Sequence, residues 1–185
     1  MTVIAWDGKT LAADKRACNG TSSSNTVSKI HRWMGGLCGF SGDLDLGMAM
    51  VQWLENGADA GSFPARQKTE DSVAFIVVHN GGRVVRYERE PVPLHFENRI
   101  QAMGSGRDYA LAAMHLGHDA RKAVEVACAL DCGCGNGIDT LCLQAGPGEV
   151  PCSDCGRALN SNEIEFYSSR CETCEGVAHA RLDQA

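Results

Sequence analysis

The end of the chain carries four cysteines in two closely spaced pairs. Cys152 and Cys155 form one Cys-x-x-Cys pair, and Cys171 and Cys174 form the second pair after fifteen intervening residues. This spacing is typical of a zinc ribbon, in which two tight turns present four thiolates to one tetrahedral Zn²⁺. A segment of roughly 35 residues has too little apolar core to fold alone, so the metal would supply much of its stability. Since four thiolates leave no open position, we expect a structural zinc and not a catalytic one.

The remainder of the 185 residues is long enough for one domain of ordinary size. Aromatic residues make up only 6% of the chain against 44% for all hydrophobic residues, so we expect a core of aliphatic side chains. The formal net charge is −6, which argues against a generic nucleic-acid-binding protein, because such proteins are usually basic.

No apolar run approaches the length of a membrane span, and the N-terminus lacks the pattern of a signal peptide. We therefore expect a cytoplasmic protein without a membrane partner. In a reducing compartment, clustered cysteines indicate metal binding before disulfide bonding.

Turn signals and hydrophobic periodicity predict a definite order of elements. Hairpins are expected over 2–14, where Asp7-Gly8 makes the turn, and over 27–40 and 72–88, with a polar loop over 18–26 and a short strand near 100–103. Helices are expected over 43–56, 104–117 and 119–128, the last one capped by Asp119. A Gly- and Cys-rich loop over 131–137 leads into a final strand over 138–143.

Composition changes sharply after Gly146-Pro147-Gly148, which breaks the chain. We place a domain boundary there, with one domain over 1–146 and the cysteine module over 147–185. The element order predicts an α+β domain in which helices cover a mostly antiparallel sheet.

The N-terminus itself suggests chemistry. The chain begins Met1-Thr2, and a methionine can be trimmed from a small neighbour. Thr2 would then carry a free α-amine beside its hydroxyl. Because an α-amine titrates near pH 8, it can take the hydroxyl proton and activate the oxygen as a nucleophile.

Several segments, in order and spacing, resemble the proteasome β-subunit and bacterial HslV peptidase family of N-terminal-nucleophile hydrolases. Besides Thr2, they are Leu11–Ala17, Val27–Ile30, Gly39–Asp43, Gly104–Gly106 with Asp108–Ala113, and Asp131–Gly135. The resemblance implies a four-layer αββα sandwich. It also implies stacked homo-oligomeric rings that hydrolyse peptides or unfolded proteins, fed by an ATP-dependent unfoldase.

The resemblance also implies the role of each site residue. Thr2 would be the nucleophile, Lys29 would lower the pKa of its hydroxyl and Asp14 would orient Lys29. The backbone N–H of Gly42 would stabilise the oxyanion. Ser105 and Asp131 would form a hydrogen-bond network around the free amine.

The chain departs from the family pattern at three points. Cys134 stands where the family often has serine, the first strand is about three or four residues short, and Met1 is present. With register strictly kept, the short strand would leave Thr2 on the order of 10 Å from the usual nucleophile position. An alternative function is therefore an inactive proteasome-like ring scaffold whose zinc ribbon binds a partner.

The other cysteines have no metal-like spacing of their own. Cys132 and Cys134 are expected to be small packing residues, or a redox pair or second metal site if Cys128 or Cys142 approaches.

Overall fold

The computed structural model describes residues 1–18, 24–65 and 72–143, together with Cys152, Ser153, Cys155, Leu159, Glu163, Arg170, Cys171, Glu172 and Cys174. The chain divides into two compact units, Met1–Leu141 and Cys142–Ala185. The boundary expected after residue 146 lies outside the described residues, so it stays a prediction.

The first sheet of the N-terminal unit has the strand order β10-β1-β2-β11. Its strands are β10 (Gln101–Gly104), β1 (Val3–Trp6), β2 (Thr10–Asp14) and β11 (Ile138–Cys142). The N-terminal hairpin is confirmed, with Ile4 opposite Ala13 and Trp6 opposite Leu11. Asp7 closes its turn, because its Oδ1 accepts hydrogen bonds from the backbone N–H groups of Lys9 and Thr10, both at 2.8 Å.

The second sheet has five antiparallel strands in the order β5-β6-β7-β8-β9. They are β5 (Ile30–Trp33), β6 (Gly36–Gly42), β7 (Val73–His79), β8 (Val84–Tyr87) and β9 (Leu94–Phe96). Strand β9 was not predicted, since Pro91 and Pro93 argue against a strand. Proline is tolerated beside an edge strand, and β9 is at the edge of this sheet.

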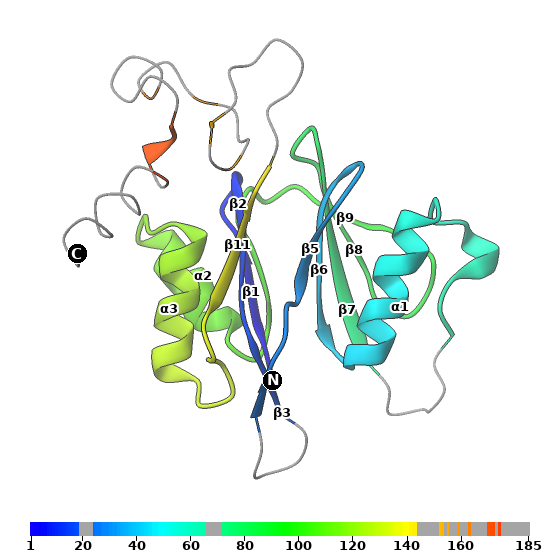
Figure 1. Ribbon diagram of the computed structural model, residues 1–185, viewed down its shortest axis with the longest axis horizontal. Coiled ribbons are helices and arrows are strands. Elements are labelled where there is room, and N and C mark those ends of the chain that lie inside the picture. The colour runs from blue at the N-terminus through cyan, green and yellow to red at the C-terminus, as the bar shows by residue number, and fades with distance from the viewer. Residues whose placement is uncertain are drawn as a thin grey trace. The chain divides into compact units, whose positions relative to one another are not determined.

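The expected loop over 18–26 is wrong in part. Strands β3 (Arg16–Cys18) and β4 (Ser24–Thr26) form a separate two-stranded ribbon, with Arg16 opposite Thr26. Asn25 is a poor strand former and β4 has no apolar residues, so the sequence carries no strand signal there; pairing with β3 satisfies the backbone groups of β4. This ribbon projects beyond the two sheets (Figure 1).

Helices cover the outer faces of both sheets. Figure 1 shows α2 (Arg107–His115) and α3 (Ala120–Leu130) beside the first sheet, and α1 (Leu44–Glu55) beside the second; a short 3₁₀ turn, η1, spans Ala60–Ser62. The Asp119 cap is confirmed, because its Oδ1 accepts the Lys122 N–H at 2.7 Å. Small side chains let α2 and α3 pack closely on the sheet, and this core contains Val3, Ala5, Ala12, Ala110, Val124 and Ala127.

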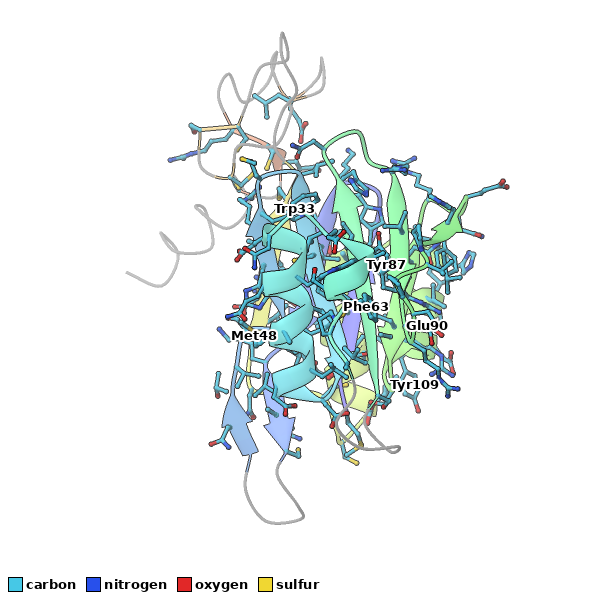
Figure 2. All side chains as sticks on the ribbon, turned by 90° about the vertical axis from the view of Figure 1, so that its right-hand side faces the viewer. Trp33, Met48, Phe63, Tyr87, Glu90 and Tyr109 are labelled. Carbon is cyan, nitrogen blue, oxygen red and sulfur yellow. The ribbon has the colours of Figure 1, made fainter. Side chains whose placement is uncertain are left out.

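Helix α1 is anchored by Trp53 at its C-terminal end. The Trp53 ring meets Phe63 and Tyr87 edge-on, at centroid distances of 5.0 and 5.1 Å, and its Nε1 donates to the Asp59 carbonyl. Figure 2 shows Phe63 and Tyr87 on this side of the molecule, near α1. Gly47 lets the helix approach the sheet, because a Cβ there would lie 2.1 Å from the Phe40 ring.

Strand β1 is buried on both faces. Val3 and Ala5 contribute to the core under α2 and α3. Ile4 faces the second sheet, where the absence of a side chain at Gly39 makes room for its Cδ1. Since the residue preceding this strand is Thr2, a fully buried strand determines where the candidate nucleophile lies.

Candidate functional site

Asp14 lies at the end of β2 and is fully buried. Its Oδ1 accepts hydrogen bonds from the Val3 N–H at 2.9 Å and from Lys29 Nζ at 2.7 Å. Its Oδ2 accepts from the backbone N–H groups of Arg16 at 3.1 Å and Gly135 at 3.0 Å. A buried carboxylate is stable only when it is paired and fully hydrogen-bonded, and four donors meet that requirement here.

Lys29 precedes β5 and is only 4% exposed. Its carbonyl accepts the Phe40 N–H at 3.0 Å, which fixes the backbone at this point against β6. Its ammonium is directed at Asp14, so the ion pair joins a strand of the first sheet to the segment that enters the second.

Thr2 is 6% exposed and is held by the segment after β10. Its backbone N–H donates to Ser105 Oγ at 3.2 Å, and its carbonyl accepts the Gly106 N–H at 3.2 Å. Gly104 makes this contact possible: its φ is +90°, and a Cβ there would lie 2.1 Å from the Thr2 carbonyl oxygen. The Thr2 hydroxyl donates to the Met1 carbonyl at 2.7 Å.

The short first strand does not hold Thr2 away from the site. The hairpin pairs up to Trp6 opposite Leu11, beyond which only a tight turn remains. Thr2 lies at the end of the hairpin opposite this turn, and Thr2 and Lys29 line the same cleft.

Asp131 follows α3 and connects Ser105 to the Gly- and Cys-rich loop. A hydrogen bond from Ser105 and the Gly133 N–H, at 2.8 Å, hold the pKa of Asp131 below its usual value. Cys134 Sγ donates to Asp131 Oδ2 at 3.4 Å. Burial, the Asp14 charge and Asp131 raise the pKa of Cys134 to about 12, so this side chain stays a protonated donor at neutral pH.

The cleft has a volume of about 480 Å³. Gly42, at the end of β6, lines it with φ of +113°, and a Cβ at this position would lie 2.0 Å from the Ser72 carbonyl oxygen. Only glycine therefore suits this position. The residues lining the cleft are Met1, Thr2, Arg16, Ala17, Cys18, Asn25, Val27, Lys29, Phe40, Gly42, Asp43 and Leu44.

The structure thus brings all six predicted residues into one region, although Asp14, Ser105 and Asp131 do not line the cleft itself. Sequence reasoning gave no role to Arg16, which lines the cleft and whose guanidinium donates to the Cys132 carbonyl and, at 3.4 Å, to Asn136 Oδ1. It also gave none to Asp139, on β11. Arg16 lies within the segment Leu11–Ala17, two residues after Asp14, and that proximity is the signal that could have found it.

The four C-terminal cysteines lie together, with their Sγ atoms all within 4.8 Å of one another. Cys155 and Cys171 Sγ are 3.8 Å apart, and the Cys171 N–H donates to Cys152 Sγ at 3.3 Å. Tetrahedral Zn–S bonds of about 2.3 Å place sulfur atoms about 3.8 Å apart, whereas a disulfide would bring them to about 2.05 Å. The sulfur cluster therefore fits a zinc ion, and all four cysteines are free thiols.

No second metal-binding group of His, Cys, Asp and Glu occurs among the residues that the structure describes. Cys132 is exposed and Cys134 is buried, with its sulfur against Asp131. Over the same residues, no helix has both the length and the apolar character needed to cross a membrane.

No protein-family model and no curated protein matches this chain. Among solved structures, eukaryotic HslV from Trypanosoma brucei matches with a TM-score of 0.59 and 21% identity, over 78% of this chain and 99% of that chain. BPH from Thiobacillus denitrificans matches in its complex with epoxomicin (TM-score 0.61, 16% identity, 80% of this chain and 100% of that chain). A second structure of BPH matches with a TM-score of 0.56 and 17% identity, over the same shares of the two chains. At these identities the likeness establishes the fold, and the chain has the mixed α/β fold of HslV and of the proteasome-like β-subunit BPH.

Proposed function

We propose that this chain is a proteasome-like peptidase subunit that hydrolyses peptide bonds with Thr2 as its N-terminal nucleophile. The observation that carries the proposal is the buried Asp14–Lys29 pair, 2.7 Å between Nζ and Oδ1, whose Lys29 lines the same cleft as Thr2. A buried ion pair contributes little to stability compared with apolar packing, so a buried pair whose lysine shares a cleft with Thr2 favours a catalytic role.

Removal of Met1 turns the Thr2 nitrogen from an amide into an amine, which can act as the base. In the first step the amine takes the hydroxyl proton while Oγ1 attacks the substrate carbonyl. The Lys29 ammonium favours the alkoxide, and Asp14 keeps Lys29 oriented. The Gly42 N–H would donate to the oxyanion, where glycine allows the substrate a close approach.

When the tetrahedral adduct collapses, the peptide C–N bond breaks and the leaving amine takes the proton held by the Thr2 amine. The product is an ester between the acyl group and Thr2 Oγ1. Water then attacks this ester, gives its proton to the Thr2 amine, and the Thr2 oxygen leaves and is reprotonated. Ser105, whose Oγ accepts from the Thr2 nitrogen at 3.2 Å, would keep the amine aimed at Oγ1, and Asp131 would hold Ser105.

We further propose a four-layer αββα arrangement, assembly into stacked homo-oligomeric rings in the cytoplasm, and unfolded protein as the substrate, delivered by an ATP-dependent unfoldase. Support comes from the fold shared with HslV and BPH over about four fifths of this chain, 78% and 80%. The order of helices and sheets in the N-terminal unit is consistent with the layering.

The C-terminal cysteines would hold a structural Zn²⁺. When bound, zinc supplies a cross-link between the two Cys-x-x-Cys pairs and takes no part in peptide hydrolysis. Cys152 and Cys171 are buried together with Leu159, a small apolar group for a folded unit, which supports a dependence on metal.

One observation favours the alternative, a catalytically inactive ring scaffold whose zinc ribbon binds a partner. With Met1 in place, the Thr2 hydroxyl donates to the Met1 carbonyl at 2.7 Å and the Thr2 nitrogen is an amide without basicity. The two functions therefore differ in one chemical fact, which is whether Met1 is removed.

Intact-mass measurement of the purified protein decides that point first, under denaturing conditions for Met1 and native conditions for zinc and oligomer size. The trimmed protein should cleave fluorogenic peptides, and epoxomicin, the ligand of the BPH structure, should add its mass to Thr2. Thr2→Ala should abolish both signals, and Thr2→Ser should retain them. Peptidase activity that survives Thr2→Ala, or trimmed protein that neither cleaves nor reacts, would reject the peptidase.

A further inference from the structure

Asp139 makes two short side-chain hydrogen bonds close to the candidate site. Its Oδ1 accepts from Lys15 Nζ at 2.8 Å, and its Oδ2 accepts from Ser28 Oγ at 2.8 Å. Lys15 directly follows Asp14 in the sequence, and Ser28 directly precedes Lys29. One carboxylate therefore connects the immediate neighbours of the two residues that form the buried ion pair.

We propose that Asp139 is a positioning residue of this site: its carboxylate holds Lys15 and Ser28 together and thereby fixes Asp14 against Lys29. This inference rests on the proposed peptidase function. It assigns a role to β11, which otherwise contributes no residue to the proposed chemistry.

The region needs such a connection because the ion pair joins two sheets. Asp14 ends β2 in the first sheet, whereas Lys29 precedes β5 in the second. Lys15 lies between β2 and β3, and Ser28 lies between β4 and β5, so neither belongs to a strand. Neither residue is part of a regular strand ladder, so side-chain contacts add to the backbone hydrogen bonds that hold these segments.

Backbone hydrogen bonds join the same three segments, which are those around Lys15, Ser28 and Asp139. The Val27 N–H donates to the Lys15 carbonyl at 2.9 Å, and the Lys15 N–H donates to the Gly135 and Gly137 carbonyls at 2.9 and 3.1 Å. Asp139 follows these glycines by a few residues, so its side chain completes a junction that the backbone begins. The Gly135 N–H reaches Asp14 itself at 3.0 Å.

The partial exposure of the Lys15–Asp139 ion pair also favours a positioning role over a purely structural one. The Lys15 and Asp139 side chains are each 27% exposed, so water screens this pair in part and its contribution to overall stability is small. The effect on reactive geometry can be larger, since a displacement of about 1 Å in an active site can lower the rate by roughly two orders of magnitude.

The test uses the full-length protein with Met1 removed and four variants. Asp139→Asn removes the carboxylate charge, Lys15→Met removes one hydrogen-bond partner of Asp139, and the Asp139→Asn/Lys15→Met double variant combines the two changes. Ser28→Ala removes the second partner with a smaller change, so it keeps the inference testable if Asp139→Asn fails to fold. Glu88→Gln is the matched control, because it breaks the 3.1 Å Arg86–Glu88 pair on and beside β8, away from the site.

We expect Asp139→Asn to lower kcat by roughly tenfold with KM unchanged, and Lys15→Met in the Asp139→Asn background to add little further loss. Glu88→Gln should behave as the original protein. A normal kcat for Asp139→Asn, or a change confined to KM, would overturn the inference while leaving the peptidase intact.

A second readout does not depend on activity. In protein labelled at lysine, NMR measures how fast the Lys29 Nζ protons exchange with water. Exchange should be at least about tenfold faster in Asp139→Asn than in the original protein, because the Asp14–Lys29 contact opens more often. If the original protein proves inactive and unreactive at Thr2, the peptidase proposal fails, and this exchange rate alone decides: an unchanged rate rejects the positioning role.

Discussion

The hydrogen-bond network around Asp14 and the cluster of four C-terminal cysteines are held together in different ways. Around Asp14, four hydrogen-bond donors converge from β1, β3 and two segments outside strands, and β1 and β2 belong to a large apolar core. Around Cys152 and Cys171, the buried members of the apolar cluster, among the described residues, are these two cysteines and Leu159. In the first region the fold positions the ionic groups, whereas in the second a bound ion would position the fold.

The difference also determines which perturbation each region tolerates. A cluster held by the chain should survive chelators but be sensitive to the loss of a single partner. A cluster held by metal should respond to a chelator in the same way as to the loss of any one of its four ligands.

Loss of zinc should produce the largest effect. Structural zinc binding is coupled to folding by about 10–16 kcal/mol in isolated ribbon-sized peptides. Cys171→Ser, or a strong chelator, should release the metal and make the segment after residue 146 susceptible to limited proteolysis. The N-terminal unit should keep its own thermal transition.

Cys38→Ser is an unsuitable control because Cys38 is buried in the N-terminal core, so exposed Cys18→Ser serves instead. Loss of zinc with Cys18→Ser, or a C-terminal segment equally resistant to protease with and without metal, would contradict the contrast.

Asp14→Asn should have the next largest effect. The change leaves Lys29 buried without its counter-charge, and the new amide cannot accept from all four donors. Breaking a buried ion pair from one side costs about 3–5 kcal/mol. Urea unfolding of the N-terminal unit should show this loss, and peptidase activity should fall by about 10³-fold or more.

The matched change is Asp108→Asn, because Asp108 is 78% exposed and pairs with Arg107 at 3.4 Å. It should alter stability by less than about 0.5 kcal/mol. Equal effects of the two substitutions would show that the Asp14 network carries no special energy.

Much of this organisation could be read from the sequence, for identifiable reasons. Asp7-Gly8 and the flanking apolar residues determined the first hairpin, because local turn chemistry specifies register. Asp119 determined the start of α3, because a cap acts within four residues. The cysteine spacing predicted a cluster that the structure contains, since two knuckles fix their sulfurs locally.

The site itself was less predictable, because its contacts are long-range. The length of the first strand suggested that Thr2 would fall short of the site, whereas Thr2 and Lys29 line the same cleft, because strand length alone does not determine where a strand lies against its neighbours. Asp139 carries no local signal either: its partners Lys15 and Ser28 lie more than 100 residues earlier. Asp14 and Lys29 were identified by resemblance, and periodicity alone would have left them on the surface.

Gly104→Ala tests how strictly the fold positions Thr2. A side chain at φ of +90° is strained, and its Cβ would lie 2.1 Å from the Thr2 carbonyl oxygen. The strain alone costs of the order of 1–3 kcal/mol, and its relief requires Thr2 to move. We expect a lower unfolding midpoint and a loss of reactivity at Thr2. Gly57→Ala, also at positive φ but with nothing near its Cβ, should lower the midpoint while leaving reactivity at Thr2 unchanged.

Cys134→Ser should have the smallest effect. It tests the hydrogen bond from residue 134 to Asp131 in the network around the Thr2 amine. A hydroxyl is a stronger hydrogen-bond donor than a thiol, so the pKa of Asp131, already below its usual value, should fall further. Because the folded-state pKa is depressed, the stabilisation by Asp131 is present above its unfolded-state value and is lost as pH falls through the folded-state pKa. The serine variant should therefore keep this stabilisation to a lower pH. An NMR titration of the Asp131 carboxyl measures the shift, and peptidase activity at neutral pH should change less than about threefold, since Asp131 is ionised in both proteins. An Asp131 midpoint that does not fall would mean that the hydroxyl at position 134 is no better a donor to this carboxylate than the thiol at 3.4 Å.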